Sequence, residues 1–424
     1  MTILEVERLE PDPSRVRAFE LEVSEGRGLG IEIEGWLEAD QLEPTRVDLV
    51  QDAMSLWELE PQPVADAPGR FGFYAPVSTL PLPPEFELVV RPQLGEGEDG
   101  ARVALARVRG RRSELHTGFD AGINPLMVTT FSRTGSNLVL RMLGEHPEIL
   151  AYRPFEYEPR VSAYWIEVLR ELTEPASYRR QITPQLRQPS RGWWLGAGNP
   201  APRPLADAQV EEGIALDTVE ALAGFCQARI EAAYGRIAPA ADRVGARFFA
   251  EKHSPNEVPM ILRELYPDAR EIFLVRDFRD MIASMLAANE RRGGVRFGRA
   301  QDDSDERFVR RFRRFAANLA ASWRRRGDRS YLLRYEDLIT RPRETVAGVV
   351  DHLGVDASAG TLEAMAASLA LREESLEAHI TSGSPEASIG RWRDDLPPEL
   401  RRVAEDVFGP ALELFGYEPA DRAA

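Results

Sequence analysis

Short segments near the start of the chain alternate apolar and polar residues with a period of two. GIEIEGWL (30–37) and EFELVV (85–90) are the clearest, and RVRAFELEV, RVDLV and RVALARV follow the same pattern. Clusters of Pro, Gly, Asp and Glu separate these segments, as turns separate strands. We therefore expect a small antiparallel β-sandwich over residues 1–112. No group of catalytic residues is found in it, which favours a scaffold or a recognition module.

A different pattern follows a polar linker over residues 113–123. LMVTTF precedes the helical segment NLVLRML, REIFLVR precedes another helix, and YLLRYED precedes a third. The third helix carries four apolar residues on one face, namely Val346, Val349, Val350 and Leu353. Because β-rich runs alternate with amphipathic helices, the pattern predicts an α/β domain over residues 124–424, with a parallel sheet flanked by helices.

The composition restricts the classes of binding partner that we expect. The chain has 424 residues, and its 53 Lys and Arg against 69 Asp and Glu give a formal net charge of −16. Such an acidic surface argues against nucleic acid or an anionic membrane as the main partner. No apolar run approaches the roughly 20 residues of a transmembrane helix, and the acidic N-terminus does not have the order of a secretory signal. We expect a cytoplasmic protein, with Cys226 as a buried structural thiol; the sequence does not indicate the oligomeric state.

The turn after LMVTTF is the strongest local signal. It consists of small and hydroxylic residues and leads directly into a helix. The backbone N–H groups and the dipole at such a helix N-terminus favour a phosphate. An ordinary N-cap by Thr134 or Ser136 is the alternative. The Walker A pattern is absent. The candidate phosphate-binding residues are Arg133, Thr134, Gly135, Ser136 and Asn137.

A second candidate phosphate site is formed by Arg276 and Ser284. Arg276 ends the apolar run of REIFLVR, and Ser284 follows in the next predicted helix. Both can face the carboxyl edge of the sheet, where ligands bind in open α/β folds. The alternative is an ion network of Arg276 with Asp277 or Asp280.

Lys252 is the only lysine of the chain, so every other basic residue among the 53 is an arginine. A compact ammonium can stabilise a single developing oxyanion in a way that a planar guanidinium cannot. Lys252 is therefore a catalytic candidate. The alternative is a lysine retained by chance in an arginine-rich composition.

Taken together, these segments resemble the sulfotransferases that use 3′-phosphoadenosine 5′-phosphosulfate (PAPS). The loop SRTGSN resembles their 5′-phosphosulfate loop, and Arg276 with Ser284 resembles their 3′-phosphate site. Glu251-Lys252 followed by Pro255 is similar to the E-K-x-P segment of carbohydrate-type and bacterial members, with one residue inserted. RYEDL (334–338) and SIGRWRDDL (388–396) also match. The resemblance covers roughly residues 124–418. Many members also carry a β-sandwich ahead of this region, with a Gly-Trp on one strand and a Gly-Phe near a turn, which Gly35-Trp36 and Gly72-Phe73 resemble.

The resemblance implies a P-loop-like sulfotransferase fold and gives the residues roles. Residues 133–137 would bind the 5′-phosphate and Arg276 with Ser284 the 3′-phosphate, while Lys252 would reach the bridging oxygen. The family's Arg-Lys-Gly before SIGRW is missing, so the last 3′-phosphate ligand could be Ser388, Gly390 or Arg391. PAPS would be the co-substrate, and no metal is required.

The resemblance also suggests a base for the acceptor hydroxyl. Glu156 is the first candidate and His253 the second. Glu156 could instead form a salt bridge with Arg153 or Arg160, and His253 could be a structural hydrogen-bonded residue.

The acceptor stays open: a hydroxyl of a carbohydrate, a lipid or a natural product is equally compatible. The Trp193-Trp194 pair suits a lid over such a substrate or a packing strap. A nucleotide-dependent kinase and a non-catalytic binding protein on the same fold are the alternative functions.

Overall fold

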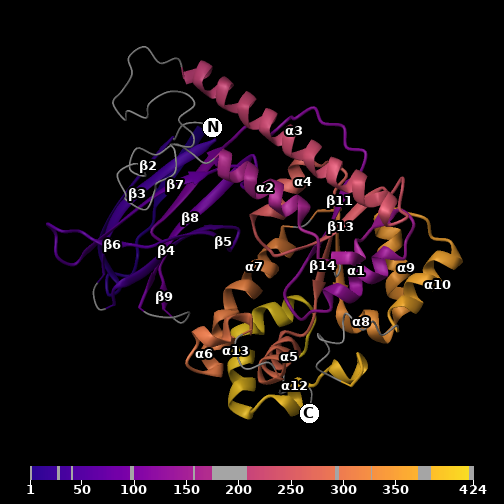
Figure 1. Ribbon diagram of the computed structural model, residues 1–424. Coiled ribbons are helices and arrows are strands. Elements are labelled where there is room, and N and C mark those ends of the chain that lie inside the picture. The colour runs from indigo at the N-terminus through magenta and orange to yellow at the C-terminus, as the bar shows by residue number, and fades with distance from the viewer. Residues whose placement is uncertain are drawn as a thin grey trace. The chain divides into compact units, whose positions relative to one another are not determined.

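In the computed structural model the chain forms two compact units (Figure 1). The first holds Met1–Asp120, Ala163–Ile230 and Met260–Leu265, and the second holds Ala121–Ser162, Glu231–Pro259 and Tyr266–Ala424. The domain limits expected from the sequence stay a prediction. The structure describes residues 2–25, 29–39, 42–95, 100–155, 158–173, 208–291, 296–325, 327–370 and 383–419.

The first unit contains two antiparallel sheets, as the alternating sequence predicts. In β3, Ile31, Ile33 and Leu37 are fully buried, whereas the intervening glutamates are partly exposed. One sheet has the order β1 (Thr2–Arg8), β10 (Ala106–Arg111), β8 (Glu85–Leu94), β4 (Pro44–Gln51) and β5 (Met54–Leu59), with β9 (Ala101–Arg102) on β8. The other has the order β2 (Val16–Glu25), β3 (Gly30–Ala39), β7 (Arg70–Ser78) and β6 (Gln62–Pro63).

Both sheets pack an aromatic ring over a glycine. Phe73 on β7 is paired with Gly35 on β3, and Phe86 on β8 is paired with Gly110 on β10. A Cβ atom at either glycine would clash with the opposing ring. Gly35 of the Gly-Trp pair and Phe73 of the Gly-Phe pair, both noted in the sequence, therefore form one of these two packing contacts.

The second unit is built on a parallel five-stranded sheet, which confirms the predicted α/β fold. The order is β12 (Ile149–Leu150), β13 (Phe248–His253), β11 (Asn124–Thr129), β14 (Arg270–Val275) and β15 (Ser330–Arg334). The strand that contains Lys252, β13, is an inner strand and was not among those expected from the sequence. The YED of YLLRYED starts a helix, α8 (Tyr335–Thr340), and does not continue the strand.

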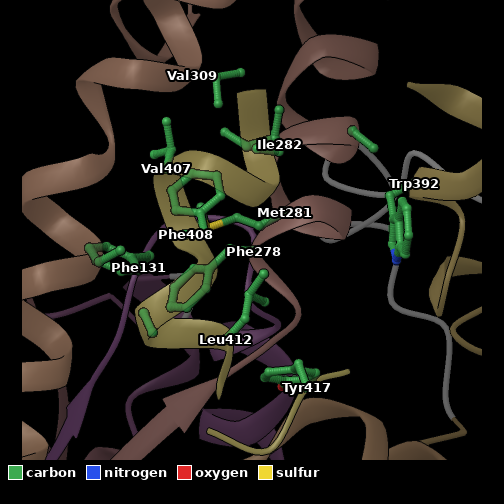
Figure 2. Packing of buried hydrophobic residues seen from close by; sticks show 14 of the residues in the cluster. Phe131, Phe278, Met281, Ile282, Val309, Trp392, Val407, Phe408, Leu412 and Tyr417 are labelled. Atoms are coloured by element: carbon green, nitrogen blue, oxygen red, sulfur yellow. The ribbon is translucent and has the colours of Figure 1, made fainter. Parts of the chain in front are cut away.

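Helices cover both faces of this sheet because alternate strand residues point in opposite directions. Ile272 and Leu274 of β14 pack in one apolar cluster with α1 and α9, which includes the predicted apolar face of α9. Phe273 and Val275 pack in the other cluster with α5 and α13, where Phe278 and Phe408 stack (Figure 2).

The helices and the 3-10 turns near the candidate site have the following bounds: α1 (Ser136–Gly144), α2 (Val161–Leu172), α3 (Ala208–Ala240), α4 (Glu257–Leu265), α5 (Phe278–Arg291), α6 (Asp305–Arg311), α7 (Arg313–Arg324), α8 (Tyr335–Thr340), α9 (Pro342–Leu353), α10 (Ala359–Ser368), α12 (Trp392–Asp395), α13 (Pro398–Leu414), η1 (Arg153–Phe155) and η4 (Glu386–Ser388). Among the helical segments that the structure describes, none is long and apolar enough to cross a membrane. Cys226 on α3 is buried, and burial raises the pKa of its thiol to about 11.

Candidate functional site

The loop between β11 and α1 contains two residues with left-handed backbone conformations. Arg133 and Gly135 both have left-handed φ angles, of 69° and 89°. A Cβ atom at Gly135 would lie 2.6 Å from the ring of Tyr335, so a glycine is required there. Gly135 is also the N-cap of α1, and this helix begins without a side-chain cap and without an acidic residue in its first turn. Its first N–H groups are thus placed to bind an anion.

Thr134 has a structural role in this loop. Its buried hydroxyl hydrogen-bonds to Thr130 Oγ1 at 2.7 Å and donates to the Phe131 carbonyl at 2.8 Å. Thr134 therefore closes the turn instead of capping α1, and the ordinary N-cap alternative does not describe this loop. Ser136, also buried, and Asn137 are the first two residues of α1.

The two candidate phosphate sites lie next to each other. The Arg133 guanidinium donates to Ser284 Oγ on α5 through Nε at 3.1 Å and Nη2 at 3.0 Å. Arg276, which follows β14, donates from Nη1 to the Arg133 carbonyl at 3.1 Å. One guanidinium thus anchors the backbone of the loop while the other extends from the loop to the second site.

Arg276 is buried and does not use the neighbouring carboxylates as hydrogen-bond partners. Its Nη2 donates to the Ser388 carbonyl at 2.7 Å, and its guanidinium lies 4.6 Å from the centre of the Tyr335 ring. Its Nε has no hydrogen-bond partner among the described residues. Asp277 is instead occupied by Arg279, at 2.7 Å. A buried cation bound to carbonyls, whose Nε has no partner among the described residues, is suited to an anionic ligand.

Asp280 holds the C-terminal segment 388–391 at this site. Its carboxylate accepts from the backbone N–H groups of Gly390 at 2.7 Å and Trp392 at 2.9 Å. Burial, and then the charge of Asp277, raises the pKa of Asp280 to about 6, against the opposing effect of these two hydrogen bonds. The sequence analysis considered Asp280 only as a partner of Arg276. The only sign of this role in the sequence is that Asp280 lies one helical turn after Arg276. Its partners Gly390 and Trp392 are 110 and 112 residues away, so no local pattern shows the contact.

The three candidate ligands in this segment differ in what they offer. Ser388 bonds through its hydroxyl to the Pro385 carbonyl at 2.6 Å and lies 3.1 Å from the Tyr335 hydroxyl. Gly390 has a φ of 74°, and its N–H is used by Asp280. Arg391 is paired with Asp395 at 2.6 Å. Arg276 connects this segment to the first phosphate loop, because it donates to the carbonyls of both Ser388 and Arg133.

Lys252 lies near the carboxyl end of β13, in register with Val128 of β11. Its ammonium forms an ion pair with Glu158, with Nζ 3.2 Å from Oε1. The lysine side chain is 18% exposed and that of Glu158 is 39% exposed. The sequence analysis did not identify Glu158, because nothing in the chain shows that it and Lys252 meet.

The neighbours of Lys252 on the same strand face a different environment. Glu251 is buried and accepts from the backbone N–H of Ser162 at 2.9 Å, from the Ser162 hydroxyl and from the Tyr234 hydroxyl. Burial raises the pKa of Glu251, and these hydrogen bonds oppose that rise. Thus the carboxylate sits at the N-terminus of α2, where the helix dipole favours a negative charge.

His253 is enclosed in the same buried group. Its Nε2 lies 3.5 Å from Ser162 Oγ and 3.6 Å from Glu251, and burial followed by the charge of Arg160 lowers its pKa to about 4. This is the environment of a structural hydrogen-bonded histidine. Glu156 and the pair Trp193-Trp194 lie outside the described residues. Within the described part of the chain, no three His, Cys, Asp or Glu side chains come together as a metal site.

Comparison with known proteins agrees with this architecture. Residues 125–359 match the model of a sulfotransferase family. Carbohydrate sulfotransferase 3 of Mus musculus is 28% identical over 169 residues, which is 37% of this chain and 35% of that protein. The protein of the same name from Tetronarce californica is 28% identical over 181 residues, or 38% and 40% of the two chains. The chain thus spans less than half the length of the curated relatives that it matches.

Solved structures give a weaker likeness. The sulfotransferase domain from the curacin biosynthetic pathway has a TM-score of 0.40 and 16% identity, covering 70% of this chain and 99% of that one. Mouse sulfotransferase SULT7A1 complexed with PAP has a TM-score of 0.38 and 11% identity, covering 70% and 86%. The family match extends over more than half of the sequence, and on that match the chain belongs to the sulfotransferase family.

Proposed function

We propose that this protein is a sulfotransferase that uses PAPS as its donor and a hydroxyl group as its acceptor. One observation carries the proposal: Arg133 in the loop before α1 donates to Ser284 at 3.0 Å, and Arg276 donates to the Arg133 carbonyl at 3.1 Å. Two anion sites are thereby held side by side, as a nucleotide with phosphates on both its 3′ and 5′ oxygens requires. PAPS supplies an activated sulfuryl group on its 5′-phosphate.

The residues present are compatible with such a nucleotide. The N-terminal N–H groups of α1, with Ser136 and Asn137, would bind the 5′-phosphate. Gly135 gives the loop its left-handed φ of 89° and allows the close approach of the Tyr335 ring. Arg276 and Ser284 would bind the 3′-phosphate, with Ser388, Gly390 and Arg391 as candidates for the remaining contact.

Arg133 has a place in both groups, because it belongs to the first loop and contacts Ser284. If the Ser284 hydroxyl donates to a bound 3′-phosphate, the Arg133 guanidinium can bind the same phosphate or the 5′-phosphate. Lys252 would offer its ammonium to the oxygen that links the sulfuryl group to the 5′-phosphate. Negative charge develops there as the S–O bond breaks, and a fixed cation stabilises it.

For the acceptor we propose only its chemical class. Because the curated relatives are carbohydrate sulfotransferases, a sugar hydroxyl is the first acceptor to test, before lipids and natural products. A cytoplasmic location remains part of the proposal, and rests on the composition alone.

Two measurements test the function. Calorimetry with 3′,5′-adenosine bisphosphate (PAP) should show binding with a Kd in the micromolar range or below, and Arg276→Ala should weaken it at least tenfold. The matched control is Arg270→Ala, since the Arg270 guanidinium donates to the carbonyls of Asp268 and Ala269. Transfer of ³⁵S from labelled PAPS to a panel of oligosaccharides should persist in EDTA. Transfer of ³²P from ATP instead would support the kinase, and PAP binding without any transfer would support a binding protein.

A further inference from the structure

We propose that Glu158 is the carboxylate that removes the proton from the acceptor hydroxyl. The inference rests on the proposed function and assigns one of its steps to a residue that the sequence motifs did not include. Its basis is a contact: Glu158 Oε1 lies 3.2 Å from the ammonium of Lys252. The base and the cation must both reach the transferring sulfuryl group, so a carboxylate next to Lys252 is well placed to be that base.

Exposure separates Glu158 from the other described candidates. Its side chain is 39% exposed, so a substrate hydroxyl can reach it. The side chains of His253 and Glu251 are 2% and 1% exposed, and both are engaged with Ser162. Neither can contact a substrate unless α2 moves away from the strand.

The segment 158–162 is held to strand β13 at both of its ends. At one end Glu158 contacts Lys252. At the other end the backbone N–H of Ser162 donates to both carboxylate oxygens of Glu251, at 2.9 Å and 3.2 Å. Because Glu251 and Lys252 are consecutive residues of β13, the same strand holds both contacts. The segment between them therefore cannot drift away from the ammonium, and Glu251 acts as a positioning residue.

The proposed step balances without another reactant. The acceptor oxygen forms a bond to sulfur while the bond between sulfur and the phosphate oxygen breaks. The hydroxyl proton passes to Glu158, and the electron pair of the broken bond stays on the phosphate oxygen. Lys252 keeps its proton and exchanges its contact with Glu158 for one with that oxygen, which leaves Glu158 free to accept the proton.

Kinetics on three isosteric variants tests the assignment. Glu158→Gln should lower kcat at least a hundredfold, while the Kd for PAP changes less than threefold. Glu167→Gln should keep kcat within threefold, because Glu167 is an exposed partner of Arg170 on α2. Glu158→Asp, which keeps the charge, should recover part of the rate. A hundredfold loss in Glu156→Gln with little loss in Glu158→Gln overturns the inference.

A nucleophile that needs no base gives a second readout. In the reverse reaction with PAP, 4-nitrophenyl sulfate releases a phenolate that is stable without protonation, so Glu158→Gln should lose less than tenfold there. A loss equal to that with a sugar hydroxyl would mean that the variant damages the site in general, and would contradict a role as base.

The single lysine allows a third readout that is independent of turnover. Reductive methylation with ¹³C-formaldehyde labels Lys252 and the α-amine. Glu158→Gln should shift the NMR signal of the labelled Lys252, and Glu167→Gln should not. An unchanged Lys252 signal in Glu158→Gln would refute the ion pair, whereas failure of the unmodified protein to bind PAP would refute the proposed function itself.

Discussion

Arg133 and Ser284 are 151 residues apart in the chain, yet the arginine side chain donates two hydrogen bonds to the serine hydroxyl. The contact joins a loop that follows β11 to a helix that follows β14, the neighbouring strand of the sheet. The contact therefore brings the loop and the helix together beside the same two neighbouring strands. The same arginine has a left-handed φ of 69°, which a non-glycine residue adopts only when its surroundings enforce it.

The Arg133–Ser284 contact predicts that Arg133 is more than a phosphate ligand. Arg133→Ala should weaken PAP binding about tenfold and lower kcat further. Arg133→Lys should restore charge but not the paired donors, so binding should recover only in part. Calorimetry and steady-state kinetics check this, with Arg236→Ala, exposed on α3, as the control. Full recovery of both quantities in Arg133→Lys would contradict a role that needs the guanidinium fork.

Gly135 predicts a pair of glycine substitutions with opposite outcomes. Gly135→Ala places a Cβ against the Tyr335 ring at a φ of 89°, so we expect a loss of stability of about 1–3 kcal/mol and weaker PAP binding. Gly235→Ala is the control: it lies within α3 with no heavy atom within 4 Å of the new Cβ, and should raise stability by about 0.5–1 kcal/mol. Thermal unfolding of both variants measures the difference. Equal stability changes would show that Tyr335 does not restrict the loop.

The fold was predictable where pattern and burial coincide. The period of two located β3 and β8, and the apolar face of α9 is buried as expected. β7 was missed because Gly72 and Pro76 resemble loop punctuation, although pairing with β3 makes this segment a regular strand. Conversely, RVALARV was expected as one strand and is divided into β9 and β10.

The candidate site, like the fold, could be predicted only in part from the sequence. The loop before α1 and the Arg276–Ser284 pair could be located from spacing, because each lies at a strand-to-helix turn. β13 could not, since the polar Glu251 interrupts its apolar run. That carboxylate is buried only because Ser162 and Tyr234, 89 and 17 residues away, donate to it. Glu158 and Asp280 likewise acquire their roles from tertiary contacts that no local pattern records.

Asp280 predicts a pH dependence of stability. Its pKa of about 6 in the folded protein lies above the ordinary value of 3.8, so protonation favours the folded state. The stabilisation is complete below the unfolded pKa and is lost as the pH rises through about 6. The difference amounts to about 3 kcal/mol. Relative to Asp280→Asn, the natural protein should therefore gain stability as the pH falls from 7 to 4.

Urea unfolding of both proteins across this pH range measures that gain. Asp395→Asn is a suitable control, because the Asp395 side chain is 37% exposed and pairs only with Arg391 in the described structure. A constant difference between the natural protein and Asp280→Asn from pH 4 to 7 would show that the carboxyl titrates at its ordinary pKa.

Lys252 predicts a separation of chemistry from nucleotide binding. Its ammonium contacts Glu158 and no phosphate-loop residue in the described structure, so Lys252→Ala should leave the Kd for PAP within about threefold while abolishing measurable turnover. Lys252→Arg should also be inactive or nearly so. A planar guanidinium on a longer stem can keep the ion pair with Glu158, yet it cannot place one compact charge on a single oxygen. Equilibrium binding and single-turnover kinetics, run on the same preparations, separate the two effects. If Lys252→Arg turns over at the natural rate, a general positive charge is sufficient and the only lysine of the chain has no special role. If Lys252→Ala does so, Lys252 has no part in the reaction.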